Sequence, residues 1–188
     1  AVTGDNSTSG TSIGFPPDLF VTAARSAYGY YWYDRLRGSN GTSLLFLTST
    51  ATDAESSASD NPQSLGQNTV AFPSGGGFWN SSAYNFSRLN FRRAPSFMDV
   101  VCYTGTGSVR TINHNLNAVP EMMWVKSRDQ INSWAVYLGG PLGGTKTANL
   151  NQTYAAYDSP GHWNNTQPTS AVFTVGNNGE VNDNNKSY

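Results

Sequence analysis

The chain has 188 residues, with eleven Lys or Arg against twelve Asp or Glu, so its formal net charge is −1. Charged residues make up only 12% of the chain, which is about half the usual share in a soluble domain. This balance gives no indication of nucleic acid or an anionic membrane as a partner. No apolar run approaches the roughly 18 residues of a membrane-spanning helix, so membrane insertion is not expected. The single cysteine excludes an intrachain disulfide framework and a multi-cysteine zinc site.

The polar residues are mainly uncharged: 20 Asn, 22 Ser, 18 Thr and 19 Gly accompany 24 aromatic residues. This composition disfavours helices and suits short strands joined by turns. No stretch combines helical spacing with caps, and Asp53–Gln67, which has no apolar run, is predicted to be a long surface loop. Alternating polarity predicts strands at Leu19–Ala24, Tyr28–Tyr33, Leu44–Thr50, Thr69–Phe72, Tyr84–Arg92, Asp99–Tyr103, Ser108–Ile112, Glu121–Ser127, Ser133–Leu138, Thr147–Thr153 and Ser170–Val175.

Two parts of the sequence resemble each other at a spacing of about 103 residues. The segment FPPDLFVTAARS (Phe15–Ser26) matches AVPEMMWVKSRD (Ala118–Asp129), and Arg25 falls on Arg128. A Gly-Thr turn follows later in both copies. One interpretation is an internal repeat, and the other is two unrelated β segments of similar composition.

The repeat predicts an all-β fold of two antiparallel β-sandwich units, jelly-roll or concanavalin-like, at residues 1–93 and 94–188. In this alignment the chain begins and stops inside a repeat. Nothing precedes Val2 to match Pro95–Cys102, and the second copy stops opposite about Tyr84. We therefore expect each sandwich to lack a strand, which more of the same polypeptide or a neighbouring chain would supply.

Three strings carry a resemblance to a known family: NFRRAPSFMDVVCYTGTG (Asn90–Gly107), INHNLNAVPEMMWVKSRD (Ile112–Asp129) and SWAVYLGGPLG (Ser133–Gly143). They are similar to a module that recurs in tandem in large structural proteins of marine and cyanobacterial bacteriophages. The closing phrase PTSAVFTVG (Pro168–Gly176) belongs to the same module, and GFPPDLF (Gly14–Phe20) and WYDRLRG (Trp32–Gly38) are the corresponding phrases of the preceding copy, so the resemblance covers nearly the whole chain. It implies a jelly-roll or concanavalin-like virion component, located extracellularly on the particle surface. It implies other copies of the chain or other virion proteins as partners, and it brings no catalytic or metal-binding residues.

The residues themselves offer no strong catalytic pattern. Cys102 lies in the apolar stretch DVVCYT, where cysteine is usually buried and inert, so we predict packing rather than nucleophilic chemistry there. No strand–G-x-S-x-G–helix context supports a serine nucleophile. Asp53 and Glu55 share the predicted loop instead of facing each other across a cleft, as glycoside hydrolysis requires. We therefore predict that the protein is not an enzyme.

Metal binding has two weak candidate sets. Neither has the dense D-x-D-x-D spacing of a calcium loop, so we predict no metal site and no cofactor. The two sets are Asp158, His162 and Asp183, and Asp53, Glu55 and Asp60.

Aromatic and polar residues near the end of the chain form a candidate glycan contact, made of Tyr157, His162, Trp163 and Asn164. A sugar-binding surface needs an apolar face for the ring and polar groups for the hydroxyls. The alternative is that Trp163 closes one end of the sandwich.

A candidate subunit contact consists of Arg88, Arg92, Tyr28, Tyr30 and Trp32. Alternation puts Arg88 and Arg92 on one face of a strand, where they could meet carboxylates of a neighbouring chain. The aromatic strand around Tyr30 carries large rings on both faces, so one face is expected to be covered by another unit or subunit.

Together these features predict a non-enzymatic phage virion component, a fibre or capsid-decorating adhesion module that binds other chains and, as a further candidate, glycans. The alternative is a carbohydrate-binding or glycan-cleaving domain of a secreted or phage-borne protein. An enzyme would concentrate its acids in one copy, whereas a scaffold repeats its architecture and leaves the acids scattered.

Overall fold

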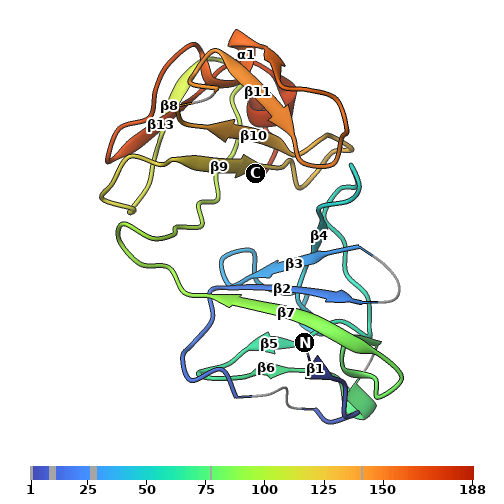
Figure 1. Ribbon diagram of the computed structural model, residues 1–188. Coiled ribbons are helices and arrows are strands. Elements are labelled where there is room, and N and C mark those ends of the chain that lie inside the picture. The colour runs from blue at the N-terminus through green and yellow to red at the C-terminus, as the bar shows by residue number, and fades with distance from the viewer. Residues whose placement is uncertain (1, 9–11, 26–28, 77, 141) are drawn as a thin grey trace. The chain divides into compact units, whose positions relative to one another are not determined.

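The structure, a computed structural model, describes residues 2–8, 12–25, 29–76, 78–140 and 142–188. All strand pairs in these residues are antiparallel, and the helices are single turns. The prediction of an all-β fold with antiparallel sheets is confirmed. The chain divides into two compact units (Figure 1), which consist of Ala1–Ser49 with Glu55–Arg93 and of Thr50–Ala54 with Ala94–Tyr188.

The first unit contains a five-stranded sheet in the order β1-β7-β2-β3-β4 and a separate pair, β5 and β6. Figure 1 shows this pair as a second layer below the larger sheet. Two 3-10 turns, η1 and η2, lie between β6 and β7. The elements are β1 (Val2–Thr3), β2 (Leu19–Ala24), β3 (Tyr31–Asp34), β4 (Leu47–Thr48), β5 (Ser64–Leu65), β6 (Val70–Ala71), η1 (Ser74–Gly76), η2 (Phe78–Asn80) and β7 (Asn85–Phe91).

Strand β2 is the centre of the first unit, because its sequence LFVTAA is apolar on both faces apart from one threonine. It pairs with β3 along one edge and with β7 along the other. The Phe20 ring packs on Tyr33 from β3 and on Phe72, which follows β6, with centroid distances of 5.9 and 6.5 Å. These buried aromatic contacts join the two layers and contribute much of the hydrophobic stabilisation.

The second unit contains a four-stranded sheet in the order β12-β11-β10-β9 and a pair formed by β8 and β13. Its hydrophobic core includes Tyr137, Trp163 and Val175, which are all at most 1% exposed. The elements are β8 (Arg110–Asn113), β9 (Met122–Val125), β10 (Ala135–Leu138), β11 (Lys146–Asn149), β12 (Tyr157–Asp158), α1 (Pro160–Trp163), β13 (Val172–Val175) and α2 (Gly179–Asn182).

Backbone hydrogen bonds of the first unit have counterparts in the second. Strands β2, β3 and β4 are consecutive neighbours in one sheet, as β9, β10 and β11 are in the other. Three further pairs of bonds join residues that correspond, to within two positions, in the alignment of the two copies. These are Gly4 N to Tyr84 O (3.1 Å) and Gly105 N to Lys186 O (2.7 Å), Asn6 N to Asn80 O (2.9 Å) and Gly107 N to Asn182 O (2.8 Å), and Arg25 N to Asn85 O (2.8 Å) and Arg128 N to Ser187 O (2.8 Å).

Within each unit, the backbone approaches another backbone segment closely at one glycine, Gly4 in the first unit and Gly105 in the second. A Cβ atom at Gly4 would lie 2.1 Å from the Ser81 carbonyl oxygen, and one at Gly105 would lie 2.2 Å from the Asp183 carbonyl oxygen. Because only glycine lacks this atom, only glycine permits such an approach. Each unit therefore uses a glycine to pack its first residues against the turn that follows η2 or α2.

Three local features differ from the sequence prediction. Asp99–Tyr103 forms no regular strand, and the Cys102 side chain is exposed, so the prediction that it is buried is wrong. Asp53–Gln67 is not a simple surface loop, because it contains β5 and the buried Asn61. Helices α1 and α2 were not expected, because a four-residue turn is too short to show helical periodicity.

Candidate functional site

The predicted glycan contact around α1 is partly buried. The exposed fractions of His162 and Trp163 are 1% and 0%, and the Trp163 ring packs edge-to-face on Tyr137 with the centroids 5.7 Å apart. This burial fits the alternative in which Trp163 packs inside the unit rather than contacting a glycan, because α1 directs both side chains into the core. Asn164 is exposed at the end of α1, and Tyr157 is half-buried in β12.

His162 is the centre of a hydrogen-bonded network in the second unit. Its Nδ1 lies 2.7 Å from Ser159 Oγ, and its Nε2 lies 2.9 Å from Glu180 Oε2. Asn149 Nδ2 donates to the same carboxylate oxygen at 3.1 Å. The hydrogen bond from His162 lowers the pKa of Glu180, against the opposing effect of burial. The network thereby ties α1 to α2 and to β11.

Ser159, His162 and Glu180 match a catalytic triad in residue type but not in geometry. In the serine hydrolase arrangement the serine bonds to Nε2 and the acid to Nδ1, whereas here the two nitrogens are exchanged. The first unit also contains a buried polar side chain, Asn61, whose Oδ1 accepts from Tyr33 Oη at 3.1 Å and from Trp79 Nε1 at 3.2 Å. Each unit therefore contains a buried polar side chain that hydrogen-bonds several elements of that unit together.

Neither Ser159 nor Glu180 was predicted from the sequence as a member of this network. A usable signal was present at the start of α1, where Ser159 precedes Pro160, since serine at the N-cap and proline at the first position are typical of a helix start. No comparable signal points to Glu180, which reaches His162 only through the packing of α2.

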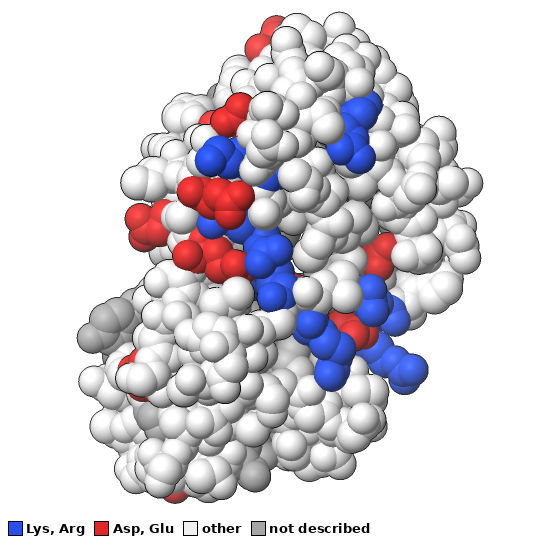
Figure 2. Space-filling model, turned by 180° about the vertical axis from the view of Figure 1, so that it is seen from behind, with Lys and Arg blue, Asp and Glu red and all other residues white. Residues whose placement is uncertain are grey.

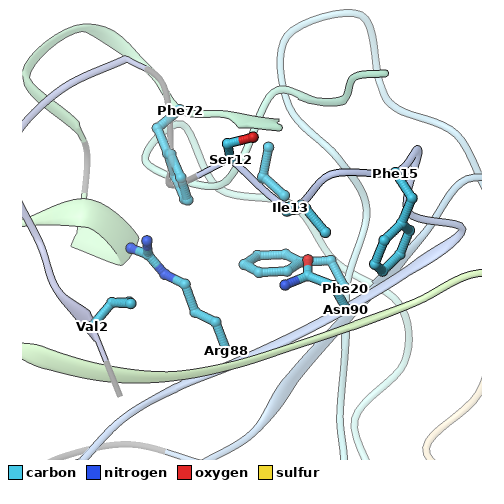
Figure 3. Close-up of a pocket in the computed structure, with 9 residues that line it drawn as sticks. Val2, Ser12, Ile13, Phe15, Phe20, Phe72, Arg88 and Asn90 are labelled. Atoms are coloured by element: carbon cyan, nitrogen blue, oxygen red, sulfur yellow. The ribbon is translucent and has the colours of Figure 1, made fainter. Parts of the chain in front are cut away.

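The Arg88 side chain points toward the interior of the first unit (Figure 3). Its Nη2 donates to Trp79 O at 2.6 Å and to Asn80 Oδ1 at 2.8 Å. The guanidinium carbon lies 5.0 Å from the ring centroid of Phe72 and 5.1 Å from that of Phe86. Burial lowers the pKa of Arg88 to about 10. The prediction that Arg88 faces a neighbouring subunit is therefore wrong, because β7 turns this side chain inward.

A cavity of about 340 Å³ lies beside Arg88 in the first unit (Figure 3). Phe15, Phe20 and Phe72 contribute an aromatic lining, and Arg88 and Asn90 of β7 contribute polar groups. The Arg88 Nε and Asn90 Oδ1 atoms are buried without a hydrogen-bond partner. The cavity therefore suits a small group that is mostly apolar but offers a hydrogen-bond acceptor to Arg88 Nε and a donor to Asn90 Oδ1.

The other residues of the predicted subunit contact have mixed positions. Tyr28 lies outside the described residues. Tyr30 is 45% exposed, and Trp32 is half-buried within β3, where it pairs with Val21 and with Leu47. Arg92 is exposed directly after β7, whereas Arg88 is half-buried.

Uncharged side chains cover most of the visible face in Figure 2. Within the described ranges, no group of three or more His, Cys, Asp and Glu residues is placed to hold a metal ion. Asp158, a member of one candidate set, lies 3.2 Å from Lys146 Nζ. In the same ranges, no helix has the length and apolar character to cross a membrane. Contacts of this surface with other molecules would depend mainly on hydrogen bonds and apolar groups.

These features define an all-β protein of layered antiparallel sheets with a buried polar centre in each unit. Residues 92–188 match a family model described as a domain of unknown function, DUF7483. Since this match spans half of the chain, the chain belongs to the DUF7483 family. The match begins at Arg92, beside the boundary of the two compact units. No curated protein and no solved structure matches the chain.

Proposed function

We propose that the protein is a non-enzymatic structural component of a bacteriophage virion, a tail-fibre or capsid-decorating module on the particle surface. The chain would consist of two tandem β-sandwich repeats, residues 1–93 and 94–188, that adhere to other copies of the chain or to other virion proteins. The observation that supports this proposal is the recurrence of backbone hydrogen bonds, such as Gly4 N to Tyr84 O and Gly105 N to Lys186 O. The sequence resemblance to tandem phage modules points the same way.

A tandem arrangement suits a structural role because similar units can be added without a new fold for each one. Each unit has its own cluster of buried apolar side chains. Each also ends in edge strands, the positions at which a neighbouring chain can add a strand to a sheet. With only 12% charged residues, little charge repulsion opposes such contacts.

Mass spectrometry of purified phage particles, combined with immunogold labelling, tests the proposal. We expect the chain in the particles at a fixed ratio to the major capsid protein, with the label on the particle surface or its fibres. A host enzyme of similar abundance in the infected cell serves as the control for adventitious material. Abundance in the infected-cell lysate together with absence from purified particles would overturn the proposal.

A second candidate function is carbohydrate binding, which the pair Tyr154 and Tyr157 favours. Tyr154 is 54% exposed, and its ring centroid lies 5.9 Å from that of Tyr157. Both hydroxyls donate to Asn149 Oδ1, at 2.9 and 3.1 Å. Such a surface offers ring faces and polar groups to a sugar.

A glycan array with the intact chain tests this candidate. Binding that is lost in Tyr154→Ala and kept in Tyr30→Ala, an exposed tyrosine of the other unit, would support it. Absence of binding, or an equal loss in both variants, would rule it out.

A further inference from the structure

Strand β9 is an edge strand of the second unit. It pairs with β10, and no described strand pairs with its other edge. Two of its side chains on one face, Met122 and Trp124, are 53% and 41% exposed. An edge strand that carries exposed apolar side chains is a surface to which another strand can be added.

The corresponding strand of the first unit shows what such an edge can hold. Strand β2 pairs with β3 as β9 pairs with β10, but β2 also pairs with β7 along its other edge. Leu89 and Phe91 of β7 stand opposite Val21 and Leu19. Val21 is 1% exposed, whereas Trp124, which corresponds to it in the alignment of the copies, is 41% exposed.

The hydrogen-bonded ladder that leads into β7 is also present in the second unit. The Ser187 carbonyl accepts from Arg128 N at 2.8 Å, as the Asn85 carbonyl accepts from Arg25 N at 2.8 Å. Thr104 forms an antiparallel bridge with Ser187, which corresponds to the pairing of β1 with β7. Figure 1 shows the C-terminus beside β9. The open edge of β9 is therefore continuous with a ladder that already exists.

We propose that the edge of β9 is a binding site for an extended segment of a neighbouring chain that follows the sequence pattern of β7. The segment would run antiparallel to β9 and place apolar side chains opposite Met122 and Trp124, as Leu89 and Phe91 do in the first unit. Main-chain hydrogen bonds would supply affinity and the alternate side chains specificity. This inference rests on the proposed function, because it names the edge through which modules of an array join.

Hydrogen exchange on the full chain tests the proposal, with the peptide NFSRLNFRR, the sequence of Asn85–Arg93, as the probe. We expect a saturating concentration of peptide to slow exchange in Met122–Val125 by about threefold or more. Exchange in β12, the opposite edge of the same sheet, should not change. A control peptide with Leu89→Pro and Phe91→Ser has the same length and charge but lacks an apolar group and the backbone donor of Leu89, which faces β2 in the first unit, so it should have no effect.

A variant of the chain locates the contact. Met122→Asp should reduce the effect of the peptide, whereas Val119→Asp, at a 55% exposed position outside β9, should not. Unchanged exchange in β9, or equal slowing by both peptides, would overturn the inference. If the chain is present in purified particles but the peptide does not slow exchange in β9, this inference alone is refuted. If the peptide slows exchange in β9 but the chain is absent from particles, only the proposed function is refuted.

Discussion

Lys126 is a buried cation whose energetics depend on pH. Lys126 is only 4% exposed, and its Nζ donates to the carbonyls of Ser127 at 2.7 Å and Gln130 at 3.1 Å. Burial lowers the pKa of Lys126 to about 8 from the ordinary 10.5. Between these two values the unfolded chain holds a proton that the folded chain has released, so stability rises with pH in this window.

We predict that the stability of the wild type increases between pH 8 and pH 10 relative to Lys126→Met, by up to about 1.4 kcal/mol per pH unit. The free energy of unfolding of both proteins, measured by denaturant titration at several pH values, checks this. Parallel pH profiles of the two proteins would contradict the prediction.

Glu180 should have the opposite pH dependence. The hydrogen bond from His162 is the main reason that the pKa of Glu180 is lowered in the folded state. The stabilisation of the fold by Glu180 is therefore fully present above the ordinary pKa of 4.5, and it is lost as the pH falls through the folded-state value. We predict that Glu180→Gln lowers the free energy of unfolding at pH 7 by about 1–3 kcal/mol and flattens its decline in acid. Asp158→Asn is the matched control, because that side chain is 78% exposed and its ion pair should contribute less than about 1 kcal/mol. Equal effects of both substitutions would contradict this account.

The inward or outward direction of individual side chains could be predicted only in part. Alternation along β7 groups its residues by face, but it does not say which face is interior. For Arg88 that choice depends on acceptors at Trp79 and Asn80, which come from η2. Trp163 is likewise buried because α1 packs it against Tyr137. Both contacts are tertiary, so neither is visible in the local sequence.

At the scale of elements, strands with a clear local pattern were predicted best. Strand β2 begins and ends at the predicted residues, because LFVTAA is apolar, rich in strand-forming residues and followed by a turn. Strands β1, β5 and β12 were missed, since each has only two residues and lies outside the longer patterned segments. Strands β4 and β6 are equally short but lie within the predicted strands Leu44–Thr50 and Thr69–Phe72. The missed strands exist because a neighbouring strand supplies hydrogen-bond partners, which is a property of the assembled sheet.

Gly105 permits a close contact between two backbone segments of the second unit, and substitution of this glycine tests that contact. A Cβ at Gly105 would meet backbone atoms of Asn182 and Asp183 at 2.9 and 2.2 Å, and backbone cannot move aside as a flexible side chain can. We predict that Gly105→Ala lowers the free energy of unfolding by about 1–3 kcal/mol through overpacking. Gly179→Ala is the control, since the nearest atoms to its added Cβ lie 3.8 Å away. Denaturant titration should therefore show a loss for the first variant and at most a small change for the second.

At the scale of the whole molecule, one part of the architecture lies beyond sequence patterns. The segment Thr50–Ala54 belongs to the second unit, although the residues on either side of it belong to the first. The Asn132 N–H donates to the Thr52 carbonyl at 3.0 Å within that unit. Such a bond between residues far apart in sequence carries no local signal, so a division based on the repeat alone assigns this segment to the first unit.

Separate cores in the two units predict separate responses to core substitutions. Phe20 belongs to the cluster of the first unit and Phe173 to that of the second, and they are 1% and 6% exposed. Truncation of a buried phenylalanine costs about 3–5 kcal/mol, because apolar contact is lost and a cavity remains. We predict that Phe20→Ala accelerates hydrogen exchange in β2 and β7 while β8 and β13 keep their protection, and that Phe173→Ala does the reverse. The two variants are matched controls for each other, and even complete unfolding of one unit leaves the other readable. Equal loss of protection in both units after either substitution would mean that the units form one cooperative structure.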